Sequence, residues 1–284
     1  MNRDSCFSSY YIGAQGFHIY YRSWMPAELR ALIVLLHGSG EHSGYYSHIG
    51  EKSLRYRVGL IIPDLRGFGK SEGHRGHINR FEEYLVDLEA LIILLQSRYP
   101  GVPIFLLGHS LGGLIAIRYS QEYNGKAKGV ILSSPVLGMR FPLPYPLKKM
   151  TDLLSWIAPS LPIEPFKWSW LRSILLGSSS ESLHDPLFTI QYTPRWFAEM
   201  LQNGVRALSE TAKYSLPTLV LYGGQDPLIN QRLLENFFLA IPHEDKKSIM
   251  FSDGGHRPLH EHHQEEVVHN IFDWVTVRSS GSAG

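Results

Sequence analysis

The chain has 284 residues, of which 44% are hydrophobic and 19% are charged, and its formal net charge is +1. This length fits one large domain, or one domain with an insertion. The near-neutral charge argues against nucleic acid as a partner, because phosphate binding needs a basic face. The charged share is below the usual ~25%, which leaves room for functional apolar surface.

The single cysteine, Cys6, excludes an intrachain disulfide and gives no sign of an oxidising compartment. The first residues contain no apolar stretch of the kind found in signal peptides. The longest apolar runs, 31–36 and 91–95, are far shorter than the ~18 residues that a membrane helix needs. We therefore expect a soluble, cytoplasmic protein.

In chain order, strand and helix signals alternate. Strands are predicted at 17–24, 31–36, 60–63, 104–107, 130–133, 218–222 and 248–251. Helices are predicted at 45–57, at 79–99 with Asn79 as the N-cap, from about 113 to 123, at 230–240 and at 260–277. This alternation predicts βαβ units and a mostly parallel sheet flanked by helices.

The alternation stops between residues 138 and 213, a stretch named here the cap segment. It is rich in proline, holds four of the six tryptophans, and offers no strand that fits the sheet. We interpret it as an inserted, mainly helical cap; an ordinary connecting segment is the alternative. The chain then divides into a first core part (1–137), the cap segment (138–213), a second core part (214–278) and a tail (279–284) that is expected to be disordered.

Residues 108–112 read Gly-His-Ser-Leu-Gly, the G-x-S-x-G pattern, between a buried strand and a helix. That context is typical of a nucleophile elbow, in which the serine occupies a sharp strand-to-helix turn. Side chains two positions before and after the serine would clash, so Gly108 and Gly112 suit these positions. We predict that Ser110 is a catalytic nucleophile; a glycine-rich turn with an idle serine is the alternative.

A serine hydroxyl is a weak nucleophile and needs a histidine base oriented by an acid. In this arrangement the acid follows the serine in the chain and the histidine comes last. Asp226 follows the strand at 218–222, and His256 follows the last strand after two glycines. We predict Asp226 as the acid and His256 as the base. Asp253 is a rival acid, but its nearness to His256 in sequence favours a role in the turn.

An oxyanion hole needs two backbone N–H groups. The N–H of Leu111 follows the nucleophile at the start of a helix, where the helix dipole also favours negative charge. The loop after the strand at 31–36 reads His-Gly-Ser-Gly, a motif that supplies the second donor in such enzymes. We predict Ser39 as that donor; a flexible turn is the alternative.

Two near matches to other motifs fail. Residues 69–71 end like a phosphate-binding P-loop, but Asp64 occupies a position that needs glycine. Residues 260–264 resemble the zinc motif H-E-x-x-H but end in Gln264. We therefore expect no nucleotide, no metal and no cofactor, and we expect residues 260–263 on a solvated helix face. His109 is expected to pack rather than to react.

The chain resembles the monoacylglycerol lipase and lysophospholipase group of serine hydrolases. The resemblance covers about residues 20–277 and rests on six segments, 37–46 (HGSGEHSGYY), 64–76 (DLRGFGKSEGHRG), 108–113 (GHSLGG), 133–135 (SSP), 185–187 (DPL) and 225–227 (QDP). It implies the α/β-hydrolase fold: an eight-stranded, mostly parallel sheet flanked by helices, with an inserted, mainly helical cap. It also implies hydrolysis of the carboxylic ester of a lipid-like substrate with one long acyl chain, a monoacylglycerol or a lysophospholipid.

The resemblance implies a place for Glu41 near the polar head of the substrate. Tyr45 departs from the pattern, because some monoacylglycerol lipases carry Arg there, and this favours a different head group. From their type and place, we predict that the cap tryptophans Trp156, Trp168 and Trp196 line an apolar acyl pocket. The alternative is that they pack the core of the cap itself.

A lipid-like ester is thus the expected partner. The aromatic cap segment is a candidate surface for transient membrane contact or for a second copy of the chain. A general carboxylesterase, or an acyltransferase or perhydrolase that uses the same triad, is the alternative function. A non-enzymatic ligand receptor on the same scaffold is a further alternative.

Overall fold

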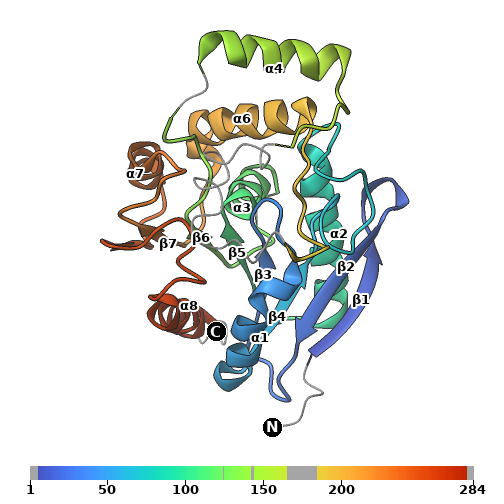
Figure 1. Cartoon of the computed structure of the whole chain (residues 1–284). Coiled ribbons are helices and arrows are strands. Elements are labelled where there is room, and N and C mark those ends of the chain that lie inside the picture. Colours follow the sequence, from blue (N-terminus) through green and yellow to red (C-terminus); the bar gives the residue numbers. More distant parts are fainter. Residues whose placement is uncertain (1–5, 124, 142–143, 165–183, 280–284) are drawn as a thin grey trace.

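A computed structural model describes residues 6–123, 125–141, 144–164 and 184–279. Its centre is one eight-stranded sheet in the order β1-β2-β4-β3-β5-β6-β7-β8 (Figure 1). β1 and β2 run antiparallel to their neighbours, and every other pair is parallel. The mostly parallel, eight-stranded sheet is therefore confirmed. The strands are β1 (Cys6–Ile12), β2 (His18–Trp24), β3 (Ala31–Leu36), β4 (Val58–Pro63), β5 (Ile104–His109), β6 (Gly129–Ser133), β7 (Thr218–Gly223) and β8 (Lys246–Phe251).

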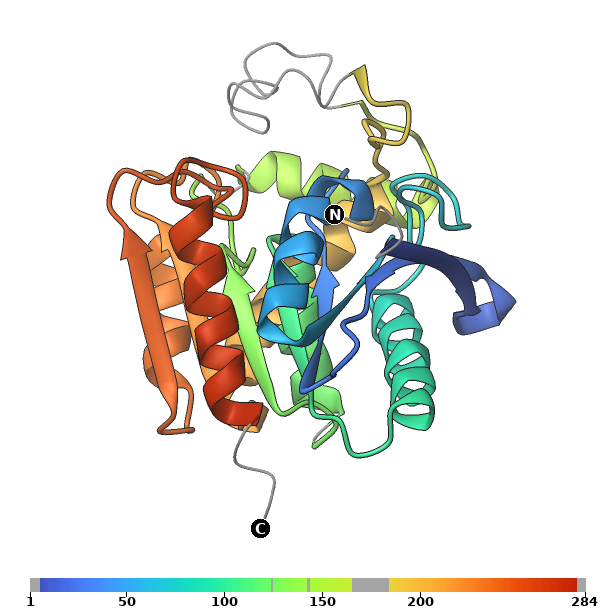
Figure 2. The ribbon, with the colours of Figure 1, turned by 90° about the horizontal axis from the view of Figure 1, so that it is seen from below.

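Helices cover both faces of the sheet. α2 (Glu82–Arg98), α3 (Leu111–Glu122) and α7 (Gln231–Ala240) pack on one face, and their apolar residues share one buried cluster. α1 (Ser47–Ser53) and α8 (Gln264–Ser279) share the cluster on the other face (Figure 2). β3 is buried at every position, as a strand covered on both faces must be.

The register of the parallel strands brings their carboxyl ends to one edge of the sheet. Leu36 at the end of β3 pairs with Gly108 of β5, and Gly223 at the end of β7 pairs with Phe251 of β8. The loops that follow these strands therefore meet at this edge, where open α/β sheets place their ligands.

The described part of the cap segment lies over this edge of the sheet (Figure 1). All eight strands of the described sheet lie outside it, and its described helices are α4 (Tyr145–Ile157) and α6 (Pro194–Ser209). α6 packs on α3, and α4 packs on α6. The division of the chain into core and cap segment stays a prediction.

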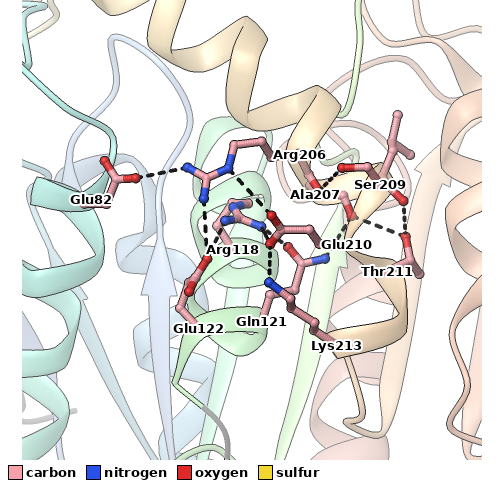
Figure 3. Close-up of polar contacts among 11 residues, drawn as sticks. Glu82, Arg118, Gln121, Glu122, Arg206, Ala207, Ser209, Glu210, Thr211 and Lys213 are labelled. Carbon is pink, nitrogen blue, oxygen red and sulfur yellow. Dashed lines mark hydrogen bonds and ion pairs between the residues drawn. The ribbon is translucent and has the colours of Figure 1, made fainter.

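Ion pairs tie α6 to the helices beneath it (Figure 3). The Arg118 side chain on α3 is 1% exposed, and it donates to Glu210 at 2.8 Å and to Glu122 at 2.6 Å. Arg206 on α6 pairs with Glu82 at the start of α2, with 3.1 Å between nitrogen and oxygen. Among these charged side chains, only that of Arg118 is buried; Glu122 and Glu210 are partly exposed.

The structure differs from the predicted elements in several places. β1 was not predicted, because only Tyr11 of its seven residues is buried and the segment gives no apolar run. The single helix expected at 45–57 is a 3₁₀ turn (Ser43–Tyr46), α1, and a second 3₁₀ turn (Leu54–Tyr56); Arg57 ends it in the left-handed conformation, with φ of 58°. The helix expected from 79 begins at Glu82 with Phe81 as N-cap, so Asn79 does not cap it.

The predicted helix at 260–277 begins only at Gln264. Residues 260–263 form turns, and they do not lie on a helix face. In the described part of the chain, no helix combines the length and the apolarity that crossing a bilayer requires.

Candidate active site

Ser110 occupies the turn between β5 and α3. Its φ of 51° and ψ of −111° lie outside the regions that L-residues favour, which is the strain expected at such a turn. A Cβ on Gly108 would lie 2.3 Å from the carbonyl oxygen of Gly112, and a Cβ on Gly112 would lie 2.0 Å from that of Leu36. Only glycine at both positions lets the chain turn this sharply against β3.

Ser110, His256 and Asp226 lie in one hydrogen-bonded line. Asp226 lies in the loop after β7 and His256 in the loop after β8, so the sheet register brings both to Ser110. His256 Nδ1 lies 2.7 Å from Asp226 Oδ2, and His256 Nε2 lies 3.0 Å from Ser110 Oγ. With the proton on Nδ1 donated to Asp226, Nε2 is free to accept the proton of Ser110.

Asp226 is fully buried, yet its carboxylate is well satisfied. Its Oδ1 accepts from the N–H groups of Leu228 at 2.8 Å and Ile229 at 3.1 Å. Burial by itself would raise the pKa of Asp226. The hydrogen bond and charge of His256 and the two backbone donors outweigh burial, so the pKa is lowered and the group stays ionised.

The rival acid Asp253 lies elsewhere. Its two oxygens accept from the Nε2 atoms of His262 at 3.0 Å and His263 at 2.7 Å, in an exposed cluster. Within the described residues, these three side chains are the one group whose spacing could hold a metal ion. Sequence inspection missed this cluster, because a turn rather than a helix brings residues 262 and 263 to Asp253.

Of the two predicted oxyanion donors, one directly follows Ser110 in the chain and the other lines the same cavity. Leu111 is the first residue of α3, and Ser39 lines the same cavity as Ser110 and His256. Neither the N–H of Ser39 nor that of Leu111 bonds to another group within the described part of the chain. Both are therefore available to a ligand oxygen.

Glu41 is 5% exposed and holds the loop after β3 together. Its carboxylate accepts from the N–H of Gly38 at 3.1 Å, from the Tyr46 hydroxyl, and from Arg257 at 2.7 Å. Burial by itself would raise the pKa of Glu41, but the charge of Arg257 leads the effects that bring it far below its usual range. Sequence inspection missed Arg257, although its place directly after His256 was a signal.

His109 is buried, and its ring lies 5.2 Å from the ring of His256. Its Nδ1 lies 3.1 Å from the carbonyl oxygen of Ser133, to which it donates. Burial lowers the pKa of His109 to about 3, so the ring is neutral at working pH. It contributes shape and no charge to the site.

A cavity of about 120 Å³ lies over Ser110, with Glu41 among the residues that line it. Trp196 of the cap segment lines it, is 2% exposed, and donates to the Tyr84 hydroxyl at 3.1 Å. Other apolar lining residues are Val136, Met139, Phe188, Tyr192, Phe197, Met200, Leu228 and Ile229.

The other two cap tryptophans do not extend this lining. Trp156 on α4 is 78% exposed and is not among the residues that line the cavity. Trp168 lies outside the described residues.

A parallel-rich eight-stranded sheet with a serine at a sharp strand-to-helix turn defines the α/β hydrolases. Comparison with known families agrees, because residues 27–263 match Hydrolase_4, described as serine aminopeptidase, S33. The chain belongs to this family of serine hydrolases.

Its relatives include lipases and a phospholipase. Phospholipase YtpA of Bacillus subtilis (strain 168) is 32% identical over 254 residues, which are 86% of this chain and 95% of that protein. Monoglyceride lipase of Rattus norvegicus is 31% identical over 94% of this chain and 89% of that protein. Among solved structures, the monoacylglycerol lipase of Paleococcus ferrophilus has a TM-score of 0.80 at 28% identity, over 92% of this chain and 99% of that chain. The protein is a carboxylic ester hydrolase, as the resemblance in sequence predicted.

Proposed function

We propose that the protein hydrolyses the ester bond of a lipid with one acyl chain, a monoacylglycerol or a lysophospholipid. The observation that carries this proposal is the hydrogen-bonded line from Asp226 through His256 to Ser110. It ends in a cavity whose lining is mostly apolar. The names of the relatives support a lipid ester as the substrate class.

In the first half of the reaction, Ser110 Oγ attacks the ester carbonyl carbon, and its proton passes to His256 Nε2. The carbonyl oxygen becomes negatively charged and accepts hydrogen bonds from the N–H groups of Ser39 and Leu111. The carbon–oxygen bond to the alcohol then breaks, and His256 Nε2 returns the proton to the leaving alcohol. The acyl group remains on Ser110.

In the second half, a water gives a proton to His256 Nε2 and attacks the acyl carbon. The bond to Ser110 breaks, Ser110 Oγ takes the proton, and the fatty acid leaves. Asp226 keeps the proton of His256 on Nδ1 and stabilises the imidazolium in both halves.

The apolar part of the cavity holds the acyl chain. The whole cavity, with its polar end, has a volume of about 120 Å³, close to that of the engineered ~150 Å³ cavity that accepts benzene. This space suits the part of the acyl chain nearest the carbonyl, and Trp196 of α6 and Met139 are among the residues that line it. Trp156 has no part in this pocket.

Covalent labelling tests the nucleophile. The wild-type protein should react with a fluorophosphonate probe and hydrolyse p-nitrophenyl esters, and Ser110→Ala should fold but do neither. Ser252→Ala, an exposed serine in the loop before His256, is the matched control and should keep both properties. Full turnover by Ser110→Ala would overturn the mechanism.

A series of acyl chain lengths tests the substrate class. We expect kcat/KM to rise from acetate to longer p-nitrophenyl esters, because each added methylene contacts apolar lining. A preference for acetate would reject the lipid-like substrate.

The outer face of α4 supports transient contact with a lipid surface. Large apolar side chains there are exposed, and Lys148 and Lys149 lie beside them: Tyr145 is 69% exposed, Met150 51%, Leu153 55%, Trp156 78% and Ile157 57%. An apolar face with basic neighbours is typical of helices that lie in the interface of anionic membranes.

Anionic vesicles test this contact. Trp156 fluorescence should shift to the blue on their addition, and Leu153→Asp should weaken binding. Concentration-dependent self-association without vesicle binding would instead assign the face to a second copy of the chain. A cytoplasmic location, which the single Cys6 favours, is part of the same proposal.

A further inference from the structure

The cavity over Ser110 has a charged end as well as an apolar one. Glu41 and Arg257 both line it, and the Arg257 side chain is 16% exposed. Arg257 Nη2 lies 2.7 Å from Glu41 Oε1, and the Arg257 guanidinium carbon lies 5.7 Å from the centre of the Tyr45 ring. Arg257 thus places a guanidinium beside the loop after β3, although position 45 of that loop is tyrosine.

Arg257 has hydrogen-bond donors that the protein does not use. A guanidinium carries five N–H donors, and within the described residues its one hydrogen bond goes from Nη2 to Glu41. Nε is buried without a partner, and Nη1 has none and is not buried. Because Nη1 is neither buried nor bonded to the protein, it is the donor that an acceptor oxygen on a ligand can reach.

The net charge of this end of the cavity is close to zero. The carboxylate of Glu41 balances Arg257, and the two nearby histidines add nothing, because burial lowers the pKa of His109 to about 3 and that of His260 to about 4. An anionic head group would lose its hydration here and would be repelled by the Glu41 carboxylate. No surplus of positive charge would offset these costs. A hydroxyl can accept from Arg257 and also donate to Glu41.

We propose that Arg257 is the residue that determines head-group specificity, and that the Arg257–Glu41 pair selects an uncharged, hydroxyl-bearing head over an anionic, phosphorylated one. This inference rests on the proposed lipid esterase function, and it names the head group that the site accepts.

The test is a ratio of two substrates with the same acyl chain. Monooleoylglycerol carries the hydroxylated head and methyl oleate lacks it, so the ratio of their kcat/KM values reports head-group recognition alone. Arg257→Gln should lower this ratio about tenfold or more, the effect of losing a hydrogen bond from a charged donor. Arg195→Gln, a partly exposed arginine of α6 that does not line the cavity, is the matched control and should leave the ratio unchanged.

Arg257→Lys is a second variant for the case that Arg257→Gln does not fold. It should fold, because it keeps a positive charge beside the buried Glu41. It should still lower the ratio several-fold, since lysine lacks the fixed fork of donors. A structural role alone would lower both rates together, so a ratio that neither variant moves would overturn this inference and leave the esterase function standing.

Two results with the wild-type protein complete the test. A kcat/KM for monooleoylglycerol above that for oleoyl lysophosphatidylglycerol supports the charge argument, and the reverse order overturns it. Turnover of none of these esters would overturn the proposed function and this inference together.

Discussion

Replacing Asp226 by Asn should abolish most activity without removing a contact. Asp226 Oδ1 accepts from two backbone N–H groups, at 2.8 Å from Leu228 and 3.1 Å from Ile229. An asparagine must keep its oxygen there, because its NH₂ group would otherwise face two donors. The NH₂ group therefore faces His256 Nδ1, where the carboxylate accepts at 2.7 Å in the wild type.

The consequence is a change of tautomer. His256 Nδ1 must accept from the new amide, so the ring proton moves to Nε2, which points at Ser110 Oγ at 3.0 Å. The base can then no longer take the proton of Ser110. The same exchange in the serine protease triad lowers kcat by about 10⁴, which corresponds to about 5 kcal/mol of barrier.

Steady-state hydrolysis of a p-nitrophenyl ester measures the effect, and thermal unfolding checks that the variant is folded. Asp253→Asn is the matched control, because Asp253 bonds to His262 and His263 and not to His256. It should keep nearly full activity. A loss of activity of less than about tenfold for Asp226→Asn would refute this reasoning. A loss of activity for Asp253→Asn that exceeds the loss for Asp226→Asn would refute it too.

Three further predictions concern stability. Gly112→Ala should cost about 3 kcal/mol or more in urea unfolding, because its Cβ would lie 2.0 Å from the carbonyl oxygen of Leu36; an unchanged midpoint would contradict this. Arg118→Leu should cost about 3 kcal/mol, since its side chain is 1% exposed and two carboxylates lose their partner, whereas Arg206→Ala, at a 39% exposed side chain, should cost less than about 1 kcal/mol. Equal costs would show that burial does not set the strength of this network. The free energy of unfolding should fall as the pH is lowered from 7 to 5, because burial lowers the pKa of His109 from 6.5 to about 3 and the unfolded chain then binds the proton more tightly. His109→Asn should reduce that fall between pH 7 and 5, and an unchanged slope would argue against a buried neutral ring.

The sequence determined most of the sheet and the positions of the reactive groups. Segments that are buried on both faces, such as β3 and residues 104–107 of β5, are apolar at every position, so the sequence alone predicts them as strands. Part of the elbow is local, because a Cβ on Gly108 would clash with Gly112 in the same turn, whereas the clash at Gly112 is with Leu36 of the neighbouring strand β3. Asp226 and His256 could be proposed because each follows a strand end, and parallel strands gather their ends at one edge.

Elements that depend on distant contacts could not be predicted. β1 has little apolar pattern of its own and is held by pairing with β2. The helix expected at 45–57 breaks into shorter pieces, and α1 packs Gly50 so closely on Trp24 that a Cβ would lie 2.2 Å from the indole ring. Such packing depends on which strand lies beside the helix, and local sequence does not carry that information.

The same limit applies to the site. The sequence placed Trp156 and Trp196 together as cap aromatics, and only the fold shows that Trp196 faces the cavity while Trp156 faces outward. Only the fold brings the guanidinium of Arg257 beside Glu41, because the two residues are far apart in the chain. Short-range geometry fixes the turn that presents Ser110, but charge and shape around it come from side chains far apart in the chain, which only tertiary packing brings into contact.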